Sequence, residues 1–148
     1  MVQIQEADVN SPEARQLLGE LNSVLEALTG ASGAKNFAAQ DVQGPRAAFL
    51  IARVDGAPMG CGAFREVSDS AAELKRVYAR PNQVGVGSTV LAALEERATG
   101  LGYRELILET RRVNRRAVGF YLRHGYVPCE NYGRYAGHSE AICFRKRL

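Results

Sequence analysis

The stretch that decides the fold runs from residue 73 to residue 87 and reads ELKRVYARPNQVGVG. Its first half belongs to an alternating segment, Ala71–Ala79, which predicts a β-strand because successive side chains of a strand point to opposite faces. Its second half is a glycine-rich turn that opens a predicted helix ending near Gly100. We expect one face of the strand to carry Glu73, Lys75, Val77 and Ala79, and the other to carry Leu74, Arg76 and Tyr78.

The junction between this strand and the helix has the features of an anion site. Gly85 and Gly87 flank the start of the helix, and glycine lets a backbone approach a ligand closely. The first N–H groups of a helix have no partner within it and lie at the positive end of its dipole. A phosphate group fits such a position, while the same glycine pattern also occurs in plain turns.

On both sides of residues 73–87, the sequence predicts strands and helices in a mixed order. Ser11 and Pro12 are typical of the N-cap and first residue of a helix, here extending to Leu28 with leucines at helical spacing. Asp55-Gly56 predicts a hairpin turn. The other predicted elements are strands over Val2–Ile4, Ala47–Val54, Ala57–Val67, Leu106–Leu108, Tyr126–Val127 and Ala141–Arg147, a helix over Arg115–His124, and a short helical turn around Lys35–Gln40. This order predicts one α/β domain over residues 1–148, with an antiparallel first half.

Composition narrows the class of protein. With 148 residues, 46% of them hydrophobic and 24% charged, the chain has the size and balance of one globular domain. No apolar run is long enough for a bilayer span, and the N-terminal residues lack the basic region of a signal peptide, so we expect no membrane partner. Three widely spaced cysteines, Cys61, Cys129 and Cys143, favour a reduced, cytoplasmic protein. No CxxC or HxxxH spacing occurs, so no metal site is expected.

The net charge of +3 admits an anionic small molecule without indicating nucleic acid. Its most concentrated part is the cluster Arg111, Arg112, Arg115 and Arg116. Three readings stay open for this cluster: a solvated start of a helix, a patch facing phosphate, or a nucleic-acid surface. Acidic residues interrupt the basic stripe that a duplex would need, so we expect no nucleic-acid partner.

A second motif follows the cluster, in the segment Asn114-Arg-Arg-Ala-Val-Gly-Phe-Tyr121-Leu-Arg-His-Gly125-Tyr126. It resembles the Asn-x-x-Ala-x-x-x-Tyr-x-x-x-Gly-aromatic signature of the GNAT superfamily of N-acyltransferases. The 73–87 stretch is similar to the acyl-CoA-binding core of the same superfamily. The resemblance implies the GNAT acyl-CoA N-acyltransferase fold, with a mixed sheet of about six to seven strands and helices on both faces. It also implies an acetyltransferase that moves acetyl from acetyl-CoA to a primary amine by direct transfer in a ternary complex.

The resemblance also implies roles for particular residues. Tyr121 matches the position that protonates the leaving thiolate, and Glu73 matches a position where some members carry the general base. For Glu73 an ion pair with Lys75 or a neighbour is an equal alternative. The residues implied to bind acetyl-CoA are Val77, Tyr78, Ala79, Asn82, Gln83, Val84, Gly85, Val86, Gly87, Ser88, Asn114 and Tyr121. The aromatic, glycine-rich segment before the last strand is a candidate acceptor wall through Tyr132, Tyr135 and His138.

One departure from the family pattern keeps a second function open. Asn82 stands where the family has arginine or glutamine, and the turn from Pro81 to Gly85 is about two residues shorter than in the family. A catalytically weak module that binds or senses acyl-CoA is therefore the alternative. The sequence does not identify the acceptor, a small-molecule or peptide amine, and it leaves the oligomeric state open, a homodimer included.

Overall fold

One mixed sheet organises the chain. The computed structural model describes residues 1–148, with seven strands in the order β1-β2-β3-β4-β5-β7-β6. Only β4 and β5 run parallel, and every other neighbouring pair is antiparallel. The strands are β1 Val2–Glu6, β2 Ala48–Val54, β3 Ala57–Glu66, β4 Ala71–Ala79, β5 Glu105–Arg111, β6 Val127–Cys129 and β7 Ala141–Arg147. The predicted mixed sheet is confirmed.

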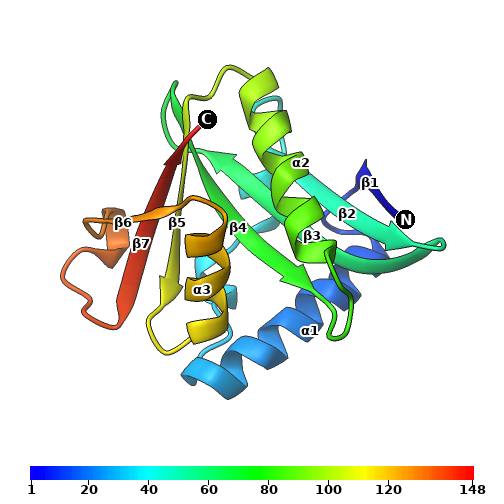
Figure 1. The fold of residues 1–148 in the computed structure, drawn as a ribbon, viewed down its shortest axis with the longest axis horizontal. Helices are drawn as coiled ribbons and strands as arrows, with labels where there is room; N and C mark the ends of the chain where they lie inside the picture. The colour runs from blue at the N-terminus through cyan, green and yellow to red at the C-terminus, as the bar shows by residue number, and fades with distance from the viewer.

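Helices cover both faces of this sheet (Figure 1). Helix α1, Pro12–Thr29, packs on one face through a core that includes Leu17, Ile51 and Cys61. Helices α2, Val86–Gly100, and α3, Arg115–Arg123, share the larger core on the other face. Three short 3-10 turns, η1 Ala34–Asn36, η2 Ala39–Val42 and η3 Gly133–Tyr135, lie in the connections. None of the helices has the length and apolar character that crossing a bilayer requires.

Helix α1 forms for the local reasons seen in the sequence but buries less than its pattern suggests. The Ser11 hydroxyl accepts a hydrogen bond from the Ala14 N–H at 3.2 Å, and Gly30 ends the helix with a φ of 82°. Leu17 and Leu21 are buried, whereas Val24 and Leu28 are 41% and 50% exposed. The last turns of α1 extend past the ends of the strands in Figure 1, where they have no sheet to cover.

The predicted helical turn near Lys35–Gln40 is two turns rather than one. The turns η1 and η2 overlap the two ends of that range, with an extended Phe37 between them. These turns lie on the α1 face, where Phe37 and Ala39 pack against the smaller core. They therefore add a wall to this face of the sheet.

A β-bulge in β4 breaks the predicted alternation of that strand. Cys61 of β3 pairs with Tyr78, but Ala63 pairs with Lys75, so two residues of β4 lie opposite Gly62. Arg76 occupies the bulge with a φ of 57°. Val77 and Ala79 therefore pack on the α2 face together with Leu74. The predicted grouping of Val77 and Ala79 with Glu73 and Lys75 is wrong, because the extra residue reverses the alternation.

The bulge lies where β4 and β5 separate. The two strands pair only over Ala71–Glu73 and Glu105–Ile107. Beyond this, β5 continues along β7 and β4 continues along β3, so residues 74–79 have no strand neighbour on the β5 side. Figure 1 shows the resulting V-shaped opening, with α3 beside it. This opening positions the candidate site.

The residue opposite the bulge tests how tightly α2 is packed on the sheet. A Cβ on Gly62 would lie 2.7 Å from Leu94 Cδ1 and 2.8 Å from Val90 Cγ1. We expect Gly62→Ala to lower the free energy of unfolding by about 1–3 kcal/mol through overpacking. Gly19→Ala is the matched control, because a Cβ there meets nothing within 4 Å. In urea titrations Gly19→Ala should stabilise α1 by roughly 0.5–1 kcal/mol, and equal midpoints for the two variants would refute the packing argument.

Candidate functional site

A cavity passes through the opening between β4 and β5, and we name it the through-sheet cavity. Its walls on the α3 face include Leu74, Leu108 and Tyr121. Its walls on the α1 face include Glu73, Lys75, Arg76, Glu109 and Tyr135. Two molecules entering from opposite faces of the sheet can therefore meet inside it.

On the α3 face the cavity holds the two predicted residues of the second motif. Tyr121 is 8% exposed, and burial raises the pKa of its hydroxyl, which makes no hydrogen bond within the chain. Asn114 is the N-cap of α3, since its Oδ1 accepts a hydrogen bond from the Ala117 N–H at 3.2 Å. Its amide nitrogen stays free at the cavity wall. The structure thus brings Tyr121 and Asn114 together beside the open edge of β4.

The glycine-rich turn presents unpaired backbone donors at the start of α2. Gly85 is the N-cap, with a φ of 79°, and no side chain caps the helix. The N–H groups of Gly87 and Ser88 donate to no acceptor in the chain. Asn82 turns the chain with a φ of 65°, and Val84 is 98% exposed. Together these features form the kind of site that binds phosphate at a helix N-terminus.

Sequence reasoning missed the residue that supports this turn. The His124 ring lies 2.7 Å from the Phe120 carbonyl oxygen through Nδ1 and 2.9 Å from the Ser88 hydroxyl through Nε2. Phe120 in turn lies against Gly87, where a Cβ would be 3.4 Å from its Cε1. The C-terminal end of α3 therefore holds the first turn of α2 in place.

Glu73 lies on the opposite face with both carboxylate oxygens engaged. Its Oε1 accepts from Arg65 Nε at 2.7 Å and lies 3.6 Å from Lys75 Nζ. Its Oε2 accepts from the Tyr132 hydroxyl at 2.6 Å. The residue is 1% exposed. Of the two readings of Glu73, the ion pair is present in the structure.

The predicted acceptor residues fall into two groups. Tyr135 lines the through-sheet cavity, and its hydroxyl accepts from Lys75 Nζ at 3.3 Å. Tyr135 and His138 also line a second, outer cavity. Tyr132 lines neither of these cavities, because its hydroxyl is directed to Glu73. Burial, together with the Glu73 carboxylate, raises the pKa of that hydroxyl.

Glu109 is a second carboxylate of the site, which the sequence motifs did not indicate. It lines both the through-sheet cavity and the outer cavity. Its side chain is 14% exposed and accepts no hydrogen bond, and its nearest cation is Arg111, with Nε at 3.7 Å. Burial raises its pKa above the ordinary value of 4.5. The alternation of β5 is the signal that could have found it, because Leu106 and Leu108 are buried in the core of the other face.

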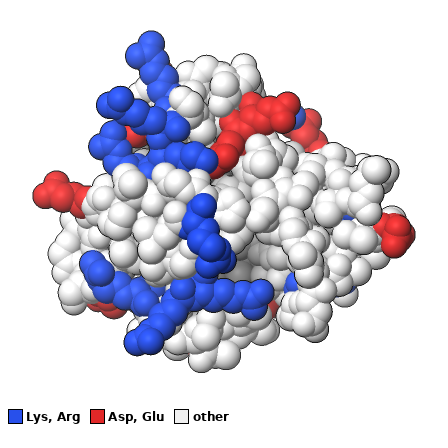
Figure 2. Space-filling view, viewed as in Figure 1, with Lys and Arg blue, Asp and Glu red and all other residues white.

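The remaining candidate features do not join the site. Cys61 and Cys143 are buried, and burial raises the pKa of the Cys61 thiol to about 12. No group of three or more histidine, cysteine or acidic side chains is placed to hold a metal ion. Figure 2 shows lysine and arginine side chains gathered over α3 and near its beginning, where Arg115 and Arg116 are exposed. They flank the α3 side of the site.

The sequence of this chain matches one known protein family. Residues 17–126 match the model of the acetyltransferase (GNAT) family. An IAA acetyltransferase of Azospirillum brasilense is 28% identical over 136 residues, which are 90% of this chain and 89% of that protein.

Two solved structures share the fold over nearly their whole length. A Klebsiella pneumoniae protein assigned to the acyl-CoA N-acyltransferases has a TM-score of 0.84 and 26% identity, with 100% of this chain and 98% of that chain covered. A GNAT family acetyltransferase from Elizabethkingia anophelis, solved with acetyl-CoA bound, has a TM-score of 0.73 and 13% identity, covering 99% and 98% of the two chains. At that identity the second likeness concerns the fold alone.

Proposed function

Because the chain belongs to the acetyltransferase (GNAT) family and is an N-acetyltransferase that uses acetyl-CoA, we propose that it acetylates a primary amine by direct transfer. In this proposal its 148 residues form one catalytic domain. The observation that carries the proposal is the through-sheet cavity, which opens to both faces of the sheet. Donor and acceptor then meet in a ternary complex without a covalent enzyme intermediate.

The α3 face supports the donor side of the proposal. Along the free edge of β4, over Val77, Tyr78 and Ala79, those backbone N–H and C=O groups that do not point toward β3 are offered to the amides of the pantetheine arm. The turn over residues 82–88 offers the unpaired N–H groups of Gly87 and Ser88 to the pyrophosphate. Asn114 and Tyr121 stand where the arm would pass through the sheet. The residues present therefore fit acetyl-CoA.

The proposed chemistry balances with two protein groups. The neutral amine attacks the thioester carbonyl carbon, the C–N bond forms, and the C–S bond breaks. Tyr121 gives its hydroxyl proton to the departing thiolate, and burial keeps that proton in place at neutral pH until then. The attacking nitrogen releases its extra proton to solvent as the amide forms, and the Tyr121 phenolate takes a proton back from solvent. An alkyl ammonium with a pKa of about 10.4 must first lose a proton, which requires a base on the acceptor side.

We assign this base to Glu109 rather than to the sequence-predicted Glu73. Both oxygens of Glu73 already accept hydrogen bonds, so its carboxylate holds the cavity wall through Arg65 and Tyr132. Glu109 has no hydrogen bond and borders both cavities on the acceptor face. Its raised pKa brings it closer to the value that suits a general base near neutral pH.

The glycine turn gives the first test, on acetyl-CoA binding. Acetyl-CoA at 100-fold its dissociation constant should stabilise the protein by about 2.7 kcal/mol, seen as a rise in Tm. Gly87→Val should abolish that rise, because the added methyl groups crowd the phosphate and Phe120. Gly100→Val, at the other end of α2 with nothing within 4 Å of its Cβ, is the matched control and should keep it. If acetyl-CoA raises the Tm of Gly87→Val as much as that of the wild type, the turn is not part of the binding site.

Tyr121 gives the second test, on the leaving group. Tyr121→Phe should lower kcat by about 10²–10⁴-fold with little change in the KM for acetyl-CoA, because only the proton donor is lost. Tyr126→Phe is the control, since its hydroxyl donates to Glu95 at 2.7 Å and stands outside the cavity. That variant should keep its kcat. Near-normal turnover of Tyr121→Phe in steady-state assays would show that Tyr121 lines the site without donating a proton.

The two carboxylates give the third test, on the base. Glu109→Gln should reduce kcat/KM most at low pH, where the amine is mostly protonated, and the defect should shrink as pH rises. The acidic limb of the wild-type profile should lie above the ordinary glutamate range, since burial raises the Glu109 pKa above 4.5. Glu73→Gln should instead lower the stability by about 2 kcal/mol, because Arg65 and Lys75 lose a charged partner. If kcat/KM shows a pH-dependent defect in Glu73→Gln but not in Glu109→Gln, the general base is Glu73.

A further inference from the structure

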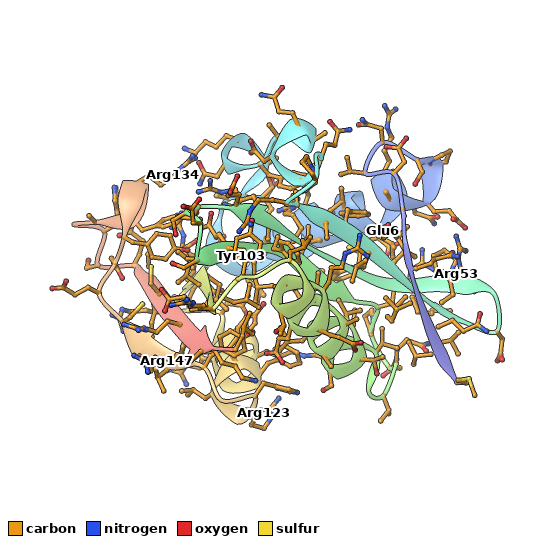
Figure 3. The ribbon with its side chains drawn as sticks, turned by 90° about the horizontal axis from the view of Figure 1, so that it is seen from above. Glu6, Arg53, Tyr103, Arg123, Arg134 and Arg147 are labelled. Atoms are coloured by element: carbon orange, nitrogen blue, oxygen red, sulfur yellow. The ribbon has the colours of Figure 1, made fainter.

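The outer cavity lies on the acceptor side, next to the through-sheet cavity. Asn36, Glu109 and Tyr135 line both cavities, so the two spaces are adjacent. The remaining walls of the outer cavity come from Lys35 of the η1 turn, from Arg111 at the end of β5, and from the segment between β6 and β7 with the first residue of β7. Figure 3 shows Arg134 on the side of the sheet opposite Arg123 of α3. A molecule held here would reach Glu109 from the side opposite to the donor.

The outer cavity carries cations that no carboxylate neutralises. Arg111 has Glu109 at 3.7 Å, and His138 has Glu140 at 3.1 Å. Lys35 and Arg134 have no acidic side chain within ion-pair distance. A surplus of positive charge is therefore left at the entrance to the acceptor face.

Arg134 is held in a way that leaves most of its donors free. Its Nη1 donates to Asn36 Oδ1 at 2.8 Å, which links the η3 turn to the η1 turn. A guanidinium has five N–H donors in a planar fork that matches a carboxylate. Since Arg134 makes this one bond, its other donors remain available at the cavity wall.

The end of the outer cavity nearest the through-sheet cavity carries a negative charge instead of a positive one. Glu109 presents a carboxylate with no hydrogen-bond donor on it, and Tyr135 and Asn36 line the path between it and Arg134. A positively charged or neutral amine is favoured beside this carboxylate. The two ends of the space therefore favour opposite ends of a molecule that carries both an amine and an acid.

We infer that the acceptor is a small amine that also carries a carboxylate, as an amino acid does. Arg134 and Lys35 bind its carboxylate in the outer cavity, and its amine faces Glu109 at the edge of the through-sheet cavity. This inference rests on the proposed transfer to a primary amine and specifies which amines the site selects. A carboxylate bound by a charged fork places the amine in a fixed direction, toward the opening in the sheet.

The test compares amino acids with their own carboxamides as acceptors, using acetyl-CoA and detection of released thiol. The carboxylate raises the pKa of its neighbouring amine, so intrinsic reactivity favours the carboxamide and cannot create a preference for the acid. We expect kcat/KM to be about 10- to 100-fold higher for the acids, mainly through KM. Equal values for the two series, or better turnover of amines without any acid group, would overturn the inference while leaving the amine transfer intact.

Substitutions in the outer cavity then test which residues cause the preference for acids over carboxamides. Arg134→Gln should lower kcat/KM for the acids to about the level of the carboxamides and change it much less for the carboxamides. Lys35→Gln should do the same in part. Arg123→Gln is the matched control, an exposed arginine on the other side of the sheet, and should keep the full preference. An equal loss for acids and carboxamides in Arg134→Gln would show that Arg134 only supports the fold, and would overturn the inference.

A binding measurement separates this inference from the transfer itself. If no amine in either series is acetylated although acetyl-CoA raises the Tm, the proposed transfer fails. In that case the two series are titrated in the presence of CoA, and the Tm is followed. A greater rise with the acids, lost in Arg134→Gln, supports the carboxylate site by itself, and no difference between the series rejects it.

Discussion

The bulge at Arg76 is the constraint on which the rest of the site depends. A bulge bends a strand and increases its twist, and β4 leaves β5 within three residues before it. A non-glycine residue with a φ of 57° is strained by roughly 1–3 kcal/mol. The side chain of Arg76 offsets this cost, since it donates to Asn22 of α1 and to the Ser32 carbonyl oxygen and lies over the Phe37 ring. Helix α1 and the η1 turn thus hold the opening of the sheet.

The opening between β4 and β5 connects the two faces of the sheet, which the strands otherwise separate. In the proposed function the donor face is built from backbone, because the β4 edge and the first turn of α2 present N–H groups whatever their side chains. The proposed acceptor face is built from side chains, namely Glu109, Tyr135 and Arg134. Backbone recognition suits a donor that the whole family shares, whereas side chains can differ from one member to another.

The sequence predicted those parts that local signals determine. The Ser11 cap, the Asp55-Gly56 hairpin and the bounds of β4 and β7 follow from residues close together in the chain, and the resemblance supplied the fold. The bulge could not be predicted, because arginine carries no preference for a positive φ and alternation appears unbroken through it. The ion pair of Glu73 with Lys75 was one of the two interpretations that the sequence allowed, but its hydrogen bonds with Arg65 and Tyr132 were hidden, since these partners lie 8 and 59 residues away in the chain. The role of Glu109 depends on the passage that the bulge creates.

Two glutamates on neighbouring strands therefore have different chemistry although they face the same side of the sheet. Glu73 lies where β4 and β5 still pair, and there Arg65, Lys75 and Tyr132 surround it. Glu109 lies two residues past the last position at which β5 pairs with β4, beside the opening, so β4 brings no donor to it. Desolvation without compensating hydrogen bonds raises the pKa of a carboxyl group, and such a group can both attract an amine and accept its proton. The separation of the strands thus creates the passage and leaves one carboxylate in it without a hydrogen-bond donor.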